Sequence, residues 1–260
     1  MTTATHTKSR IEPPSKLLQL LELRASWEFA AGVAALPWLR LAPRGDGHPV
    51  IVLPGLVASD VSTKLLRDFL SRRGYDVHGW GLGRNYGPRP GVEESMLAMI
   101  DKLHAKTGRT ISLIGQSLGG AYARMLAAQR PDAVRSVITL GSPVGGHPRA
   151  SNAWRVYEFT SGKSAVDPQR WKQVTQTPLV PTTSIYSRTD GVVAWQTSVE
   201  PSGGLHTESI EVVSSHVGMA VHPLVLFAVA ERLGQPEGDW KPFERRGWRA
   251  ALFPKPATAT

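Results

Sequence analysis

Ser117, Asp190 and His216 are the residue types that together turn a serine into a nucleophile. A serine hydroxyl attacks poorly by itself, so a histidine must accept its proton and an acid must orient that histidine. Ser117 lies within a G-x-S-x-G pattern at residues 115–119, which holds a serine on a sharp turn between a strand and a helix. The chemistry that these residues predict is acyl transfer through a covalent intermediate on Ser117.

Chain order selects the acid and the base. In folds that use this turn, the acid follows the serine and the histidine follows the acid, each on a loop after a later strand. Asp190 comes directly after an apolar run at residues 183–187, and His216 follows the last predicted strand. We therefore expect Asp190 and His216 to complete the triad. The alternatives are Asp167 as the acid, and His206 or His222 as the base.

Two backbone N–H groups should stabilise the negative oxygen of the tetrahedral intermediate. The N–H of Leu118, one residue after Ser117, is the first expected donor. The second is expected from the loop after an apolar strand at residues 50–53, where Gly55 permits close approach of the backbone. We expect the N–H of Leu56 to be this second donor, with that of Gly55 as the alternative.

Apolar residues next to these positions could form a wall that binds the acyl chain, although packing in the core would explain them equally well. They are Val57, Val192, Trp195 and Val217.

The glycine-rich segment 81–87 resembles a dinucleotide-binding fingerprint only superficially. Its third glycine is one residue late, and the chain continues into a proline-containing stretch instead of a helix. We expect Arg84 and Asn85 to hold this loop by hydrogen bonds, with substrate contact as the alternative. Since the phosphate-loop, H-E-x-x-H and EF-hand patterns are also missing from the sequence, no cofactor and no metal is expected.

Short apolar runs alternate with stretches of helical period from residue 49 onward. This alternation predicts an α/β fold with a mostly parallel central sheet and helices on both faces. Strands are expected at 50–53, 75–80, 110–114, 134–140, 183–187 and 208–214, and helices at 61–73, 92–106, 117–129 and 224–232. The alternation stops between about residues 142 and 181, where an inserted cap or lid is expected.

The chain divides into three predicted parts. Residues 1–46 form an N-terminal helical segment packed on the core, residues 47–236 form the α/β domain with its cap, and residues 237–260 form a basic aromatic tail. Within the first part, residues 15–36 have the pattern of an amphipathic helix ending at Pro37, whose apolar face should cover the domain. An interfacial anchor or a substrate entrance is the alternative. The tail is expected to dock on the domain, with peripheral membrane or polyanion contact as the alternative.

Composition limits the class of protein further. The 260 residues include 30 Lys plus Arg, 21 Asp plus Glu and no Cys, which excludes disulfide scaffolds, cysteine-bound zinc and thiol nucleophiles. The net charge of +9 is spread along the chain, so a nucleic-acid partner is not expected. No secretory signal pattern and no apolar run of membrane-spanning length is recognisable, and we expect a soluble, cytoplasmic protein. The oligomeric state is not predicted.

Four motifs, at residues 52–56, 115–120, 187–193 and 215–218, together resemble the lipase and esterase branch of the α/β-hydrolase fold. Within that branch the chain is most similar to bacterial esterases and lipases grouped with the GPI-inositol deacylases. The resemblance implies hydrolysis of carboxylic esters without a cofactor, but it does not define the substrate class. The expected partner is a small-molecule or lipid ester. One departure is Pro54-Gly55, where many lipases have His-Gly.

The resulting prediction is a serine carboxylic-ester hydrolase acting on esters of short- to medium-chain acids. Acyl transfer to an alcohol other than water uses the same residues, and a non-catalytic binding protein could share the fold. Both remain alternatives.

Overall fold

The computed structural model describes residues 11–201, 204 and 206–257. Six strands form one sheet in the order β2-β1-β3-β4-β5-β6, and each pairing between neighbouring strands is parallel. The strands are β1 (Pro49–Leu53), β2 (Asp76–Gly79), β3 (Ile111–Gln116), β4 (Val134–Leu140), β5 (Thr182–Tyr186) and β6 (Thr207–Glu211). This confirms the predicted α/β class and its parallel sheet.

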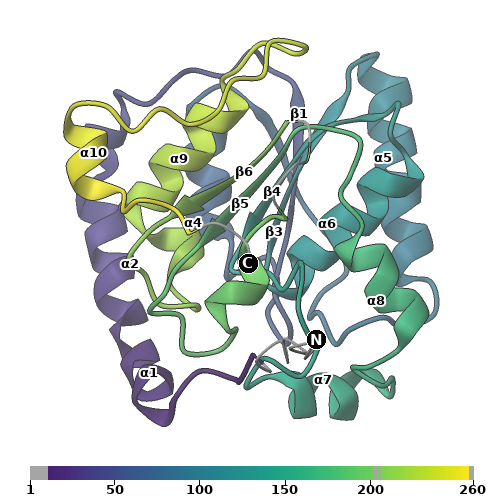
Figure 1. Cartoon of the computed structure of the whole chain (residues 1–260). Coiled ribbons are helices and arrows are strands. Elements are labelled where there is room, and N and C mark those ends of the chain that lie inside the picture. Colours follow the sequence, from purple (N-terminus) through teal and green to yellow (C-terminus); the bar gives the residue numbers. More distant parts are fainter. Residues whose placement is uncertain (1–10, 202–203, 205, 258–260) are drawn as a thin grey trace, which may run out of the picture.

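Helices cover both faces of the sheet (Figure 1). One face carries α5 (Val92–Thr107) and α6 (Leu118–Gln129), while the other carries α4 (Lys64–Arg72) and α9 (Pro223–Leu233). In β1, Val50 and Val52 pack toward α4 and α9, whereas Ile51 and Leu53 pack toward α5 and α6. Because both faces are buried, the strand is apolar throughout instead of alternating. Each such buried side chain contributes about 1.5–3 kcal/mol to folding, so the sheet is a firm base for the loops at its ends.

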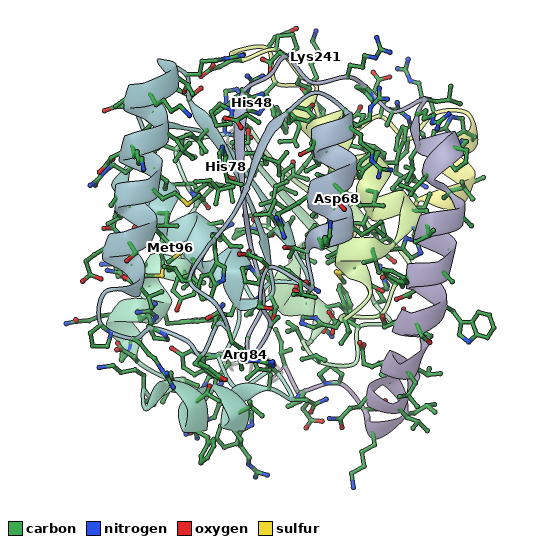
Figure 2. The ribbon with its side chains drawn as sticks, turned by 180° about the vertical axis from the view of Figure 1, so that it is seen from behind. His48, Asp68, His78, Arg84, Met96 and Lys241 are labelled. Atoms are coloured by element: carbon green, nitrogen blue, oxygen red, sulfur yellow. The ribbon has the colours of Figure 1, made fainter. Side chains whose placement is uncertain are left out.

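Two helices, α7 (Trp154–Ser161) and α8 (Pro168–Thr175), lie in the segment where a cap was expected. Asp167 caps α8 by accepting hydrogen bonds from the backbone N–H groups of Gln169 and Arg170. Figure 2 shows Arg84 at the α7 end of the molecule, opposite to His48, which precedes β1. This is the end at which the strands finish and the predicted catalytic loops begin.

The N-terminal segment is helical but interrupted. It contains α1 (Lys16–Leu20), the 3₁₀ turn η1 (Leu21–Arg24), α2 (Ala25–Ala34) and α3 (Leu36–Leu39). Helix α3 continues past the expected end, because its proline stands in the first turn, where a missing N–H costs nothing.

The apolar side of this segment does not pack as predicted. Leu23 and Trp27 are 75% and 78% exposed, and Leu17 and Leu20 are also exposed, whereas Glu28 is buried. The expectation that the apolar face covers the domain is therefore wrong for these residues. Polar groups are buried instead, since the domain offers them backbone N–H donors, which are described below.

The C-terminal tail forms α10 (Trp248–Leu252) beside α9 (Figure 1). Phe253 is buried against Phe227 and Phe243, and the ring of Trp248 packs edge-on to Phe227. These aromatic residues extend the core on the α9 face of the sheet. None of the helices in the described ranges combines the length and apolarity of a membrane-spanning segment.

Candidate active site

Ser117 occupies the sharp turn between β3 and α6. Its φ of 52° and ψ of −119° lie in a region that residues with side chains rarely adopt. A Cβ at Gly115 would overlap the backbone of Gly119, and a Cβ at Gly119 would overlap the carbonyl oxygen of Leu53. Gly115 and Gly119 are therefore needed for α6 to start close to the ends of β1 and β3. This close packing makes the turn sharp and holds Ser117 at its tip.

Asp190 and His216 form a buried pair on the loops that follow β5 and β6. The Asp190 Oδ2 atom lies 2.7 Å from Nδ1 of His216. The other carboxylate oxygen, Oδ1, accepts hydrogen bonds of 2.8 Å from the backbone N–H groups of Val192 and Val193. Since both oxygens have partners, the carboxylate is held in one orientation toward the imidazole.

The environment of His216 changes its proton affinity. Burial by itself would lower the pKa of His216, but the negative charge and hydrogen bond of Asp190, with a further contribution from Glu22, outweigh burial and raise it. The pKa of His216 therefore lies above the ordinary histidine value. A base of this kind takes up a proton readily while Asp190 stabilises the resulting imidazolium.

Contacts between the loops bring the pair to the serine turn. Gln116, which precedes Ser117, donates a hydrogen bond of 3.0 Å from Nε2 to the carbonyl oxygen of His216. A Cβ at Gly141 would lie 3.1 Å from both Asp190 Oδ2 and His216 Nδ1, so the end of β4 adjoins the pair. The three predicted catalytic residues thus gather at the carboxyl ends of β3, β5 and β6.

The two predicted oxyanion donors also lie at this turn. A Cβ at Gly55 would lie 3.4 Å from the Cβ of Ser117, which places the loop after β1 against the serine. Among the described residues, no protein acceptor is found for the backbone N–H of Leu56 or Leu118. Both groups therefore keep a donor for an external oxygen, as an oxyanion hole needs.

Arg84 and Asn85 hold the loop that carries Leu56. The buried Asn85 donates from its side-chain Nδ2 to the backbone carbonyl of Pro54 at 2.8 Å. The backbone carbonyl of Asn85 accepts from the N–H of Val57 at 2.6 Å. Arg84 donates to the Val57 carbonyl at 3.0 Å. These hydrogen bonds join segment 81–87 to the loop after β1, as expected for Arg84 and Asn85. It also keeps Val57 at a φ of 53°, which an unsupported valine would avoid.

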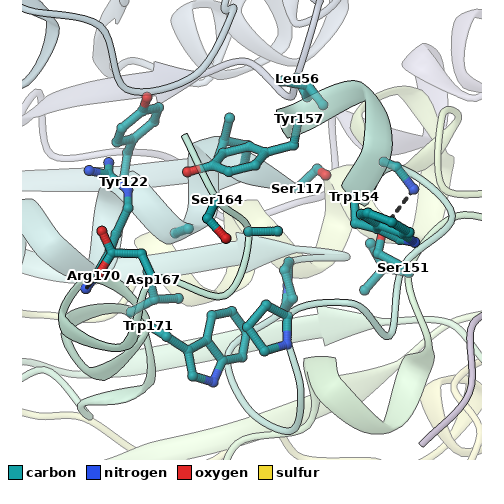
Figure 3. Close-up of a pocket in the computed structure, with 18 of the residues that line it drawn as sticks. Leu56, Ser117, Tyr122, Ser151, Trp154, Tyr157, Ser164, Asp167, Arg170 and Trp171 are labelled. Carbon is teal, nitrogen blue, oxygen red and sulfur yellow. Dashed lines mark hydrogen bonds between the residues drawn. The ribbon is translucent and has the colours of Figure 1, made fainter. Parts of the chain in front are cut away.

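A cavity opens between Ser117 and the cap (Figure 3). Its volume is about 760 Å³ when the space open to solvent is included. Its lining is mainly apolar and aromatic, and includes Leu56, Leu118, Met125, Trp154, Tyr157 and Trp171. The polar exceptions include Arg170, which is paired with Glu93 at 2.5 Å.

The four residues expected to form the acyl wall lie outside this lining. Val193 lines the cavity, whereas Val57, Val192, Trp195 and Val217 are not among its walls. Trp195 stacks on Tyr186, and Val217 is 60% exposed. Contact of these four residues with a substrate stays a prediction.

The alternative acid and bases are occupied elsewhere. Asp167 lines the cavity but serves as the N-cap of α8, and His222 caps α9 by accepting a hydrogen bond from the N–H of Leu224. The ring of His206 lies against that of Trp240, tilted by 49° with 5.5 Å between the ring centroids.

Sequence reasoning did not identify Gln116 or Glu22 as site residues. Nothing in the sequence signals the contact between Glu22 and the loops after β5 and β6, because it joins residues 169 or more positions apart. Gln116 lies within the serine motif, but the motif leaves that position free.

Comparison with known proteins agrees with this architecture. The profile of a family described as alpha/beta hydrolase fold matches residues 48–161. Over 109 residues the chain is 34% identical to a triacylglycerol lipase of Pseudarthrobacter phenanthrenivorans and to one of Burkholderia plantarii. The matched stretch is 38% of this chain in each case and 34% and 30% of the two lipases, so the chain spans about a third of these relatives.

Among solved structures, lipase B of Aspergillus fumigatus superposes with a TM-score of 0.58 at 17% identity. That match covers 78% of this chain and 58% of the lipase. The chain therefore has the α/β-hydrolase fold.

Proposed function

We propose that the protein is a serine carboxylic-ester hydrolase. The observation that carries the proposal is the buried Asp190–His216 pair beside a serine held on a strained strand-to-helix turn. In the proposed reaction, Ser117 attacks the acyl carbon while His216 takes its proton, and Asp190 holds the imidazole in the tautomer that accepts at Nε2. His216 then protonates the leaving alcohol, and water attacks the acyl-enzyme by the same route in reverse.

Charge on the oxyanion would be stabilised by the N–H groups of Leu56 and Leu118. Both belong to residues that line the cavity next to Ser117. Loss of one such donor typically costs about 3 kcal/mol of transition-state stabilisation.

We propose short- to medium-chain acyl esters as the substrates. The support is the apolar floor of the cavity, where Leu118, Ala121 and Met125 of α6 meet Val174 of α8. Aromatic side chains of the cap, Trp154 and Trp171, also line the cavity (Figure 3). The similarity to triacylglycerol lipases supports an ester as the substrate. Membership of the lipase group related to GPI-inositol deacylases is part of the same proposal and rests on the sequence motifs.

Peripheral contact with a lipid surface is part of the proposal as well. It is supported by the exposed apolar side chains on α1, η1 and α2, of which Trp27 and Leu23 are the most exposed. Exposed apolar side chains of a helical segment can insert at a membrane–water boundary.

The test is hydrolysis of p-nitrophenyl esters from acetate to palmitate by the wild type and by Ser117→Ala. We expect turnover that falls to background in the variant, with an optimum at short or medium chains. Absence of turnover by the wild type across the whole series would reject ester hydrolysis and favour acyl transfer or a binding function.

A further inference from the structure

The N-terminal helical segment makes polar contacts with both loops that carry the acid and the base. The half-buried Glu22, in η1, accepts three backbone N–H hydrogen bonds through its carboxylate. Its Oε1 accepts from Gly191 at 2.8 Å and from His216 at 2.9 Å, and its Oε2 accepts from Val217 at 2.9 Å. One side chain therefore links the residue after Asp190 to His216 itself.

Neighbouring side chains hold the residues immediately before the acid and the base. Arg24 donates from Nη2 to the carbonyl and hydroxyl oxygens of Thr189, at 2.8 and 2.7 Å. Glu28 accepts from the N–H of Ser215 at 2.7 Å and from its hydroxyl group. Each catalytic loop is thus attached to the segment at more than one point.

The loops are shaped for this contact. A Cβ at Gly191 would overlap the carbonyl oxygen of Leu18, and a Cβ at Gly218 would overlap the carboxylate of Glu28. Neither glycine has a positive φ, so close approach of the segment is what requires them. The segment lies so close to the two loops that neither Gly191 nor Gly218 has room for a methyl group. This close fit on both loops indicates a specific contact.

We propose that Glu22 is a positioning residue for the Asp190–His216 pair, acting from outside the α/β core. It fixes the backbones of the two loops relative to each other, so that Asp190 stays in register with Nδ1 of His216. This proposal rests on the proposed function and adds a residue that lies outside the stretch matched by the hydrolase family.

The charge of Glu22 provides a readout that a purely structural role would not affect. The charged groups facing the His216 loop are Asp190 at the imidazole, Glu22 at the backbone, and Glu28 with its partner Arg24 at the preceding residue. Asp190 and Glu22 both raise the pKa of His216. Removing the Glu22 charge should therefore lower that pKa and move the acid limb of kcat/KM to lower pH.

The test is Glu22→Gln, which keeps the size of the side chain and one acceptor oxygen, compared with Glu12→Gln as a charge-matched control. Glu12 is exposed and makes no hydrogen bond among the described residues. For Glu22→Gln we expect kcat to fall about 10- to 100-fold, the range expected for a misaligned catalytic pair. KM should stay within about 2-fold, because Glu22 does not line the cavity. Glu22→Ala should lose more activity, and Glu12→Gln should match the wild type.

An activity-independent measurement separates this proposal from the proposed function. The imidazole of His216 is titrated by NMR in the wild type and in Glu22→Gln, with His216→Gln used for assignment. A lower His216 pKa in Glu22→Gln supports the positioning role even if no ester is turned over. The proposal is overturned if neither the His216 pKa nor kcat changes in Glu22→Gln. It is also overturned if kcat falls together with thermal stability while the pH profile does not shift.

Discussion

Replacing Asp190 with Asn tests the geometry of the acid in detail. The Oδ1 atom of Asp190 accepts two backbone N–H bonds of 2.8 Å, from Val192 and Val193. In Asp190→Asn the amide oxygen must stay at that position, because an NH₂ group there would face two donors. The NH₂ group then points at Nδ1 of His216, 2.7 Å from the present oxygen, and forces Nδ1 to be the acceptor.

The resulting tautomer carries its proton on Nε2 and cannot accept one from Ser117. By analogy with serine proteases, this wrong tautomer lowers kcat by about 10⁴-fold near neutral pH. That is about 5 kcal/mol of barrier. The fold should persist, since the variant keeps the size and the two backbone contacts of the side chain.

The assay is kcat and kcat/KM for a p-nitrophenyl ester between pH 5 and 10, with unfolding followed by circular dichroism. In the wild type, kcat/KM should rise with pH through the pKa of His216, which lies above its ordinary value. Asp167→Asn is the matched control, because Asp167 also lines the cavity and Asn caps a helix as well as Asp does. Activity of Asp190→Asn within about 10-fold of the wild type, or an equal loss in Asp167→Asn, would refute the reasoning.

Two further predictions concern the buried Arg124–Glu200 ion pair and the exposed apolar side chains of α2. Arg124→Leu should destabilise the protein by about 3–5 kcal/mol in urea unfolding at neutral pH, chiefly because it leaves the buried Glu200 without its partner, and also because it removes the donor to the carbonyl oxygens of Val174 and Gln176. Burial raises the pKa of Glu200 despite Arg124, so stability is lost as pH rises through that pKa, and the defect of Arg124→Leu should shrink at low pH. Arg124→Leu/Glu200→Leu should recover most of the loss, and a penalty independent of pH would contradict this account. Trp27→Ser should reduce co-sedimentation with phosphatidylcholine vesicles several-fold without changing hydrolysis of a water-soluble ester; unchanged sedimentation would reject lipid contact through this helix.

The strands and the serine turn could be predicted because local sequence determines them. A strand buried on both faces, such as β1, must be apolar throughout, and the serine turn needs glycines where backbones touch. The order of acid and base then left few candidates. The last strand was predicted to reach Ser214 but ends at Glu211, because the N–H groups of Ser214 and Ser215 bond to side chains of other segments.

The orientation of the N-terminal segment could not be predicted. Its apolar periodicity indicates which side chains share a face, but burial depends on the surface that receives the helix. Here that surface consists of backbone N–H groups on the loops after β5 and β6, which Glu22 and Glu28 satisfy. A group of N–H donors on two distant loops leaves no pattern in the sequence of the helix. The cavity lining was missed for the same reason, since it depends on how α7 and α8 fold over Ser117.

Covalent labelling tests most directly whether Ser117 is an activated nucleophile. The protein is incubated with a fluorophosphonate and examined by intact mass and peptide mapping, alongside Ser117→Ala and Asp190→Asn. We predict a single adduct on Ser117 in the wild type, none in Ser117→Ala, and much slower labelling in Asp190→Asn. No adduct on the wild type, or an adduct on another residue that persists in Ser117→Ala, would contradict this role of Ser117.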